Sequence, residues 1–134
     1  MNVPSLDFTD MILADPSVIT EDLTFAVNLF IGKMPDAPDL CVCIYDTGGP
    51  APAPNYVLNK PTIQIRVRGS QNGYQTAYDL AQSIKEMLGD VHNRVVNSTR
   101  YIGVWVMSEV SFVGYGAKDR PEFTFNLLSQ RTTT

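Results

Sequence analysis

The chain has 134 residues, of which 44% are hydrophobic and 18% are charged. This length and composition fit one folded domain and exclude both a disordered chain and two independent catalytic domains. The net charge of −4 divides unevenly, because residues 1–46 carry eight acids against Lys33 alone and residues 47–134 carry a net charge of +3. An acidic and a basic half either steer copies of the chain into head-to-tail association or are ordinary surface charge.

The first predicted element is a helix that begins after Ser5, a good N-cap residue, and ends at Ala14, before a proline. Strands are expected at residues 24–31 and 40–45, and the loop between them favours an antiparallel hairpin. Cys41 and Cys43 share a face of the second strand. We expect both to be reduced cysteines in the core or at a sheet edge.

A loop rich in glycine and proline follows at residues 47–60. It cannot lie inside a helix or a sheet, because Pro50, Pro52 and Pro54 lack the backbone N–H that both structures use. We expect an exposed, partly extended loop. It is either a plain connection between strands or an arm that reaches a neighbouring subunit.

The next strand, residues 61–69, has the clearest alternation in the chain. Its apolar residues at 63, 65 and 67 form one face, and Gln64, Arg66 and Arg68 form the other. One side of the sheet is therefore expected to be core and the other side polar and positive. The two arginines line a lumen, contact a neighbouring subunit or face solvent, and they are too few for a nucleic-acid stripe.

The main helix is predicted at residues 74–88, where apolar residues recur at helical spacing at positions 77, 80, 81, 84, 87 and 88. Strands are expected at 101–107 and 120–127, and the polar tail, residues 129–134, is expected to fray. Residues 1–134 thus predict a single α+β domain. Its mostly antiparallel single-layer sheet has four to six strands, with two helices packed on one face.

Catalytic and metal-binding groups are scarce. The one histidine, His92, follows the main helix in an expected loop, and with Cys41 and Cys43 it offers too few ligands for a metal site. No glycine-rich phosphate loop is present in the sequence, and no apolar run reaches the ~20 residues that span a membrane. We therefore expect a protein that is neither an enzyme nor bound to a cofactor or a membrane, and the N-terminus has no secretion signal.

The order of four segments, 32–39, 45–49, 61–68 and 120–126, around a helix at 74–88 resembles the minor capsid and tail terminator family of long-tailed bacteriophages. The resemblance spans nearly the whole chain and consists of turn and strand sequences. It implies a virion protein that forms a ring, usually a hexamer, at the head-proximal end of the tail tube. Such a ring stops tube polymerisation, offers a joining surface to the head or neck, and lets DNA pass.

This resemblance implies as partners other copies of the chain, the tail tube protein and a head-to-tail connector protein, with a monomer before assembly as one alternative. We expect the loop 47–60, with its three prolines, and Arg66 and Arg68 to contact a neighbour or the tube. Asp36 and Asp39 are expected to meet a basic surface. A stopper or neck protein is the closest alternative function, and a DNA-binding accessory factor is a weaker one, because the chain is acidic with a pI of 4.7.

Overall fold

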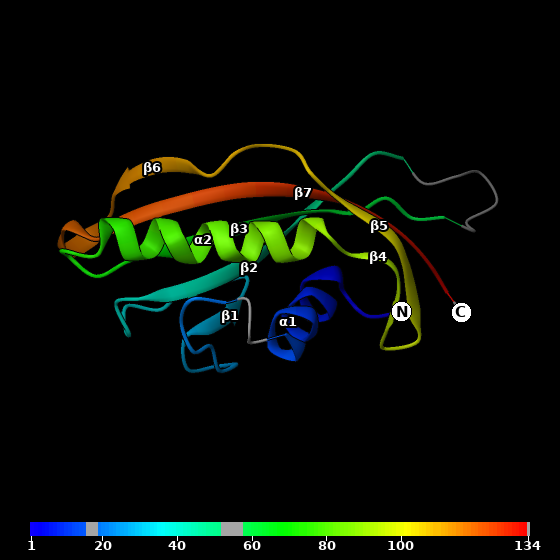
Figure 1. Cartoon of the computed structure of the whole chain (residues 1–134), viewed down its shortest axis with the longest axis horizontal. Coiled ribbons are helices and arrows are strands. Elements are labelled where there is room, and N and C mark those ends of the chain that lie inside the picture. The colour runs from blue at the N-terminus through cyan, green and yellow to red at the C-terminus, as the bar shows by residue number, and fades with distance from the viewer. Residues whose placement is uncertain (16–18, 52–57, 134) are drawn as a thin grey trace.

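A computed structural model describes residues 1–15, 19–51 and 58–133, and within them the chain folds into a curled seven-stranded sheet with two α-helices (Figure 1). The sheet order is β1-β2-β3-β7-β5-β4, and β6 also pairs with β7. The elements in chain order are α1 (Pro4–Ala14), β1 (Leu29–Ile31), β2 (Cys41–Gly48), β3 (Thr62–Arg68), α2 (Tyr74–Gly89), β4 (His92–Val96), β5 (Thr99–Val106), β6 (Ser111–Tyr115), the short 3-10 helix η2 (Ala117–Asp119) and β7 (Pro121–Thr133).

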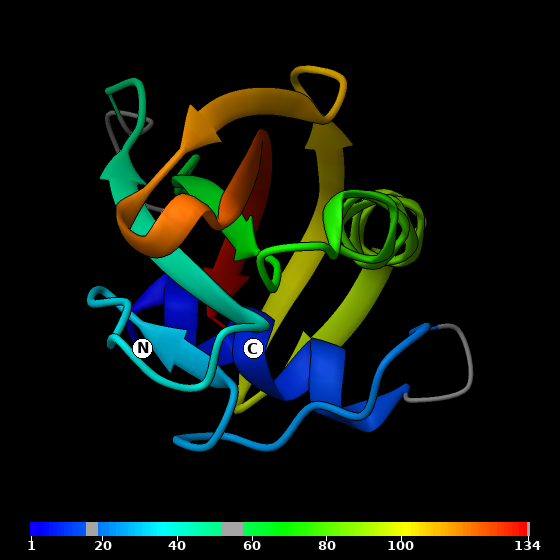
Figure 2. The same ribbon diagram turned by 90° about the vertical axis from the view of Figure 1, so that its left-hand side faces the viewer.

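One core holds both helices against the inner face of the sheet, so the α+β prediction is confirmed, with one strand more than expected (Figure 2). The six positions of α2 predicted from helical spacing are all buried, as are the inward residues Ile63, Ile65 and Val67 of β3. Five of the six described strand pairs are antiparallel. The amphipathic periodicity therefore decides which side of each element faces the core.

Helix α1 begins at Pro4, two residues earlier than predicted, and its N-cap is Val3 rather than Ser5. The backbone N–H and the hydroxyl of Ser5 instead donate to the Asp46 carboxylate, at 3.0 and 2.6 Å. A carboxylate at this end of a helix is favoured by the helix dipole and satisfies a free N–H group. Asp46, at the end of β2, thus holds α1 against the sheet.

The predicted hairpin between residues 24–31 and 40–45 is wrong. Only Leu29–Ile31 form a strand, β1, and it runs parallel to β2, with Leu29 opposite Val42. Residues 24–28 form a turn instead, in which the Asn28 side chain accepts from the Thr24 N–H and donates to the Asp22 carbonyl. This side-chain bonding competes with strand formation, and the chain then crosses the outer face of the sheet before β2 begins.

Two other regions differ from the sequence expectations. Residues 92–96, expected as a loop, form β4, which joins β5 through a two-residue turn with positive φ at Asn97 and Ser98, as tight hairpins require. The tail expected to fray continues β7 as far as Thr133. It stays ordered there because β5 pairs with one edge and Asn59 exchanges two backbone hydrogen bonds with Arg131 on the other, each 2.9 Å long.

Candidate assembly interface

The segment Asp36–Asp39, which we call the strap, lies against the outer face of the sheet, the face opposite the helices. Arg68, at the end of β3, donates from Nη2 to the Pro38 carbonyl at 2.7 Å and from Nε to the Asp39 carbonyl at 3.1 Å. Its side chain is consequently buried, with the residue 5% exposed. The alternation in β3 predicted the correct face for Arg68, but this face is covered here, so Arg68 holds the strap and is not a surface cation.

A second arginine, Arg120, binds the strap from the turn before β7. Its Nη2 donates to Asp36 Oδ1 at 3.0 Å and its Nη1 to Asp39 Oδ1 at 3.2 Å, while Lys118 Nζ lies 2.6 Å from Asp36 Oδ2. Hydrogen bonds from Lys118 and Arg120 lower the pKa of Asp36 below its usual value. The basic surface that Asp36 and Asp39 meet therefore belongs, in this structure, to their own chain.

Two buried thiols lie on the outer face of β2, with Cys41 opposite Arg68 and Cys43 opposite Arg66 in the β2–β3 pair. Cys41 and Cys43 have no exposed surface and form no disulfide, and burial raises the pKa of both. A raised pKa keeps a thiol protonated and unreactive at neutral pH. The two cysteines are thus buried packing residues of the outer face of β2.

Arg66 is the one arginine of β3 whose side chain remains partly open, at 33% exposure. Its Nη1 lies 3.6 Å from Glu122 Oε1, and its guanidinium lies over the Tyr45 ring, 5.8 Å from the centroid. Burial is the main cause that raises the pKa of Tyr45 to about 12. Arg66 is therefore held in place on the outer face with some of its charge accessible to a partner.

The loop 47–60 is described only at its two ends. Pro50 is exposed and lines an open pocket of about 320 Å³ together with Pro4, Lys60 and Arg131, whereas Pro52 and Pro54 lie outside the described residues. Gly49 is tightly packed, because a Cβ atom there would lie 2.3 Å from the Lys60 carbonyl oxygen and its φ is +129°. The two ends of the loop are thus pinned together where it leaves the sheet.

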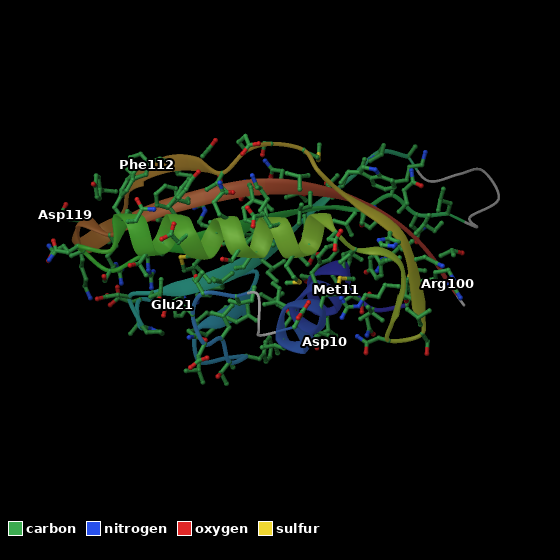
Figure 3. The ribbon with its side chains drawn as sticks, viewed as in Figure 1. Asp10, Met11, Glu21, Arg100, Phe112 and Asp119 are labelled. Atoms are coloured by element: carbon green, nitrogen blue, oxygen red, sulfur yellow. The ribbon has the colours of Figure 1, made fainter. Side chains whose placement is uncertain are left out.

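Sequence reasoning missed an exposed apolar surface on β6 and the start of α2, which we call the aromatic edge. Its members are Tyr74, Phe112, Val113 and Tyr115, exposed at 45, 42, 52 and 60%. The Phe112 ring lies 5.2 Å from Tyr74 and 5.3 Å from Tyr115, centroid to centroid. Figure 3 shows Phe112 at the rim of the molecule. The apolar residues at 112, 113 and 115, next to glycines, were the available signal.

The acidic and basic halves of the sequence meet in the folded chain. Of the six ion pairs among the described residues, four join an acid of residues 1–46 to a cation of the second half. Three of these are in the strap, and the fourth pairs Asp7 with Arg131 at 3.5 Å. At the strap and at Asp7, the acidic and basic halves of the sequence therefore lie side by side and do not form two separate charged surfaces.

The described residues contain no group of three His, Cys, Asp or Glu side chains placed to hold a metal ion. Within the same ranges, neither helix combines the length and apolarity needed to span a bilayer. The outer face presents the partly open Arg66, and the rim presents the aromatic edge.

The sequence matches the model of the bacteriophage tail terminator protein family over residues 9–133. The chain belongs to this family. It is accordingly a structural protein of the phage tail, and its place is in the virion. No curated protein matches the chain.

Solved structures show that this tail terminator family member shares its fold with a known virion component. One similar chain belongs to the virion of a native gene transfer agent particle, with a TM-score of 0.65 and 15% identity, covering 97% of this chain and 95% of that chain. A second solved chain has a TM-score of 0.49 and 16% identity, covering 94% of this chain and 96% of that one. At 15% identity, the likeness to the gene transfer agent chain shows a shared fold.

Proposed function

We propose that this protein forms a homohexameric ring at the head-proximal end of the phage tail tube. The ring stops tube polymerisation and provides the surface to which the head or neck is joined. The observation that carries the proposal is the match to the tail terminator family over residues 9–133. A surface of strands, loops and apolar edges, rather than a reactive pocket, supports a role in assembly.

The size of the domain is compatible with such a ring. A chain of 134 residues has a radius of gyration of roughly 14 Å and fills a sphere about 36 Å across. Six such spheres in contact leave a central hole of about the same width, and duplex DNA, about 20 Å wide, passes through it. DNA then moves through the lumen without sequence-specific binding.

We assign the ring and tube contacts to the loop 47–60 and to Arg66. Arg66 is partly open on the outer face and held by Glu122 and Tyr45, so its orientation is fixed before a partner arrives. Arg68, Asp36 and Asp39 support this face from within the chain through the strap. A weak contact between copies keeps the protein monomeric in the host cytoplasm until a tube end raises the local concentration.

The test is electron microscopy of particles assembled without this protein. Overlong tails lacking heads are expected, because nothing caps the growing tube. Tails of normal length together with heads that leak DNA would overturn the terminator role in favour of a stopper. Tight DNA binding by the purified protein with a steep salt dependence would instead indicate a DNA-binding accessory factor.

Complementation with variants tests the residue assignment. Arg66→Glu is expected to restore capping poorly, because it reverses the accessible charge and places it beside Glu122. Arg66→Lys, which keeps the charge, serves as the matched control. Equal complementation by both variants would remove Arg66 from the interface while leaving the ring proposal intact.

A further inference from the structure

The aromatic edge combines two features that define what can bind there. Strand β6 pairs with β7 and with no other described strand, so its second edge presents backbone N–H and C=O groups without a strand partner. The exposed rings of Tyr74, Phe112 and Tyr115 cluster over one face of β6, where Phe112 also contacts Phe123 of β7. An open strand edge is satisfied by an added extended segment, and exposed aromatic rings favour proline side chains.

We infer that the aromatic edge binds the proline-rich segment 50–55 of a second copy of this chain, as an added β-strand. This inference rests on the proposed ring and names the surfaces that form it. The segment reads PAPAPN, with a proline at every second position. In an extended strand, alternate residues direct their N–H groups to the same side. In such an added strand the N–H groups of residues 51, 53 and 55 would all point to one edge, and the prolines would leave the other edge without donors.

Such a segment can pair with β6 on one side and cannot extend the sheet further, because proline is tolerated only at an edge. Its three prolines share one face and can pack on the exposed rings. Its six residues are one more than the five of β6, so the segment is long enough to pair along the whole strand. Both the hydrogen-bonding pattern and the side chains of the segment thus complement the aromatic edge.

A copy cannot satisfy its own edge. The loop 47–60 leaves the sheet beside Thr62, at the opposite end of the molecule from β6 (Figure 1). Phe112 pairs with Phe123, which pairs with Val67. Five residues of strand and two strand spacings therefore separate the two places, about 20 Å in all. Pro52 is three residues beyond the pinned Gly49, a reach of only about 10 Å.

The contact consequently joins unlike surfaces of two copies at opposite ends of the molecule. Repeated head-to-tail contacts of this kind close into a ring when the rotation between copies allows it. The same chain carries both the segment and its binding edge, which favours a second copy over a different protein as the occupant.

Disulfide trapping tests the contact directly. The variant Ala51→Cys/Val113→Cys is allowed to assemble on tail tubes and is then oxidised. We expect a ladder of linked oligomers on non-reducing gels, because Ala51 lies at the start of the segment and Val113 in the middle of β6. The matched control is Ala51→Cys/Val95→Cys, since Val95 is a valine of similar exposure, 49%, on the edge strand β4. The native thiols are buried and do not compete.

The outcomes separate this inference from the proposed function. Six-fold rings at tube ends without the Ala51 to Val113 linkage, or with equal linkage to Val95, would overturn the inference and leave the terminator role standing. Tails of normal length in the absence of the protein would overturn the terminator role itself.

A second measurement does not require assembly. A synthetic peptide of residues 47–60 is titrated into the purified protein while backbone amide signals are followed by NMR. Shifts are expected in β6 and near Tyr74, with at least tenfold weaker binding to a Val113→Asp variant and unchanged binding to Val95→Asp. Shifts confined to another strand, or equal binding to both variants, would refute the inference.

Discussion

Replacing Arg131 with methionine should strongly destabilise the fold, although the sequence alone places this residue in an expendable tail. The Asp7 carboxylate on α1 is fully buried. It accepts hydrogen bonds from Tyr101 Oη at 2.6 Å and Asn97 Nδ2 at 2.9 Å, and Arg131 Nη1 lies 3.5 Å away. The same Nη1 donates to the Asn2 carbonyl at 2.8 Å. Arg131 thus compensates a buried charge and ties the N-terminus to β7.

The expected magnitude follows from what remains after the substitution. Methionine preserves much of the packing of the arginine stem, but the Asp7 carboxylate is left with neutral donors only. Tyr101 stays a neutral donor, because burial and its hydrogen bond to Asp7 raise the pKa of its hydroxyl. It therefore brings no positive charge to Asp7. Removing one partner of a buried ion pair costs about 3–5 kcal/mol. We expect about 3 kcal/mol here, or a fall in Tm of about 10 °C for a domain of this size.

Urea unfolding followed by the fluorescence of Trp105, the one tryptophan in the chain, measures this loss. Arg100→Met is the matched control, because the Arg100 guanidinium bonds the exposed side chain of Asn93 and its loss should change stability by less than about 0.5 kcal/mol. The double variant Asp7→Asn/Arg131→Met should lose less than the sum of the single changes, since no uncompensated charge remains. Equal unfolding midpoints for Arg131→Met and Arg100→Met would refute the reasoning.

Three further predictions concern the strap and the outer face. Arg120→Met should release the strap and speed the labelling by a thiol reagent of Cys41, which lies near Arg68 and Arg120, whereas Arg120→Lys should do so less. Equal labelling rates for all three proteins would contradict this. The pKa of Asp36 is lowered in the folded state, so its contribution to stability is present above about pH 4 and is lost as the pH falls through the folded pKa. Unfolding measured across an acid titration should show this loss of stability, and the Asp36→Asn variant should not show it. Gly103→Ala should displace the Trp105 indole, whose nearest ring atom lies 2.8 Å from where the new Cβ would be, and an unchanged emission spectrum would contradict it.

Local patterns predicted most of the elements of this fold. The periodicity of residues 74–88 identified every buried position of α2, and the alternation in β3 identified its core face. Each of these elements buries one face in a single core, so the spacing of apolar side chains along the sequence is enough to identify the buried face. The predicted hairpin failed because Asn28 stabilises a turn through hydrogen bonds that the hydrophobic pattern does not reveal.

The candidate interface was predictable only in part, since it depends on contacts between distant residues. The expectation for Arg66 and Arg68 came from one strand, and it could not show that the strap, thirty residues earlier, covers Arg68 and leaves Arg66 partly open. The tail beyond Leu128 contains polar residues with no visible reason for order. Its pairing with β5 and the burial of Arg131 beside Asp7 are long-range effects that composition cannot indicate.

The ion pairs formed within one chain affect which surfaces are available for contact between copies. The unequal charge of the two halves suggested electrostatic docking, but Asp36 and Asp39 bind cations of their own chain, and Asp7 pairs with Arg131. The surface left for a neighbour at the β6 end consists of aromatic rings and a strand edge. Contacts of this kind are little affected by ionic screening, which weakens exposed charge pairs beyond about 10 Å at 0.1 M salt. The disulfide linkage between positions 51 and 113 of neighbouring copies, introduced by Ala51→Cys and Val113→Cys, should therefore form equally at low and high salt, and its loss at high salt would show that charge pairs hold this contact together.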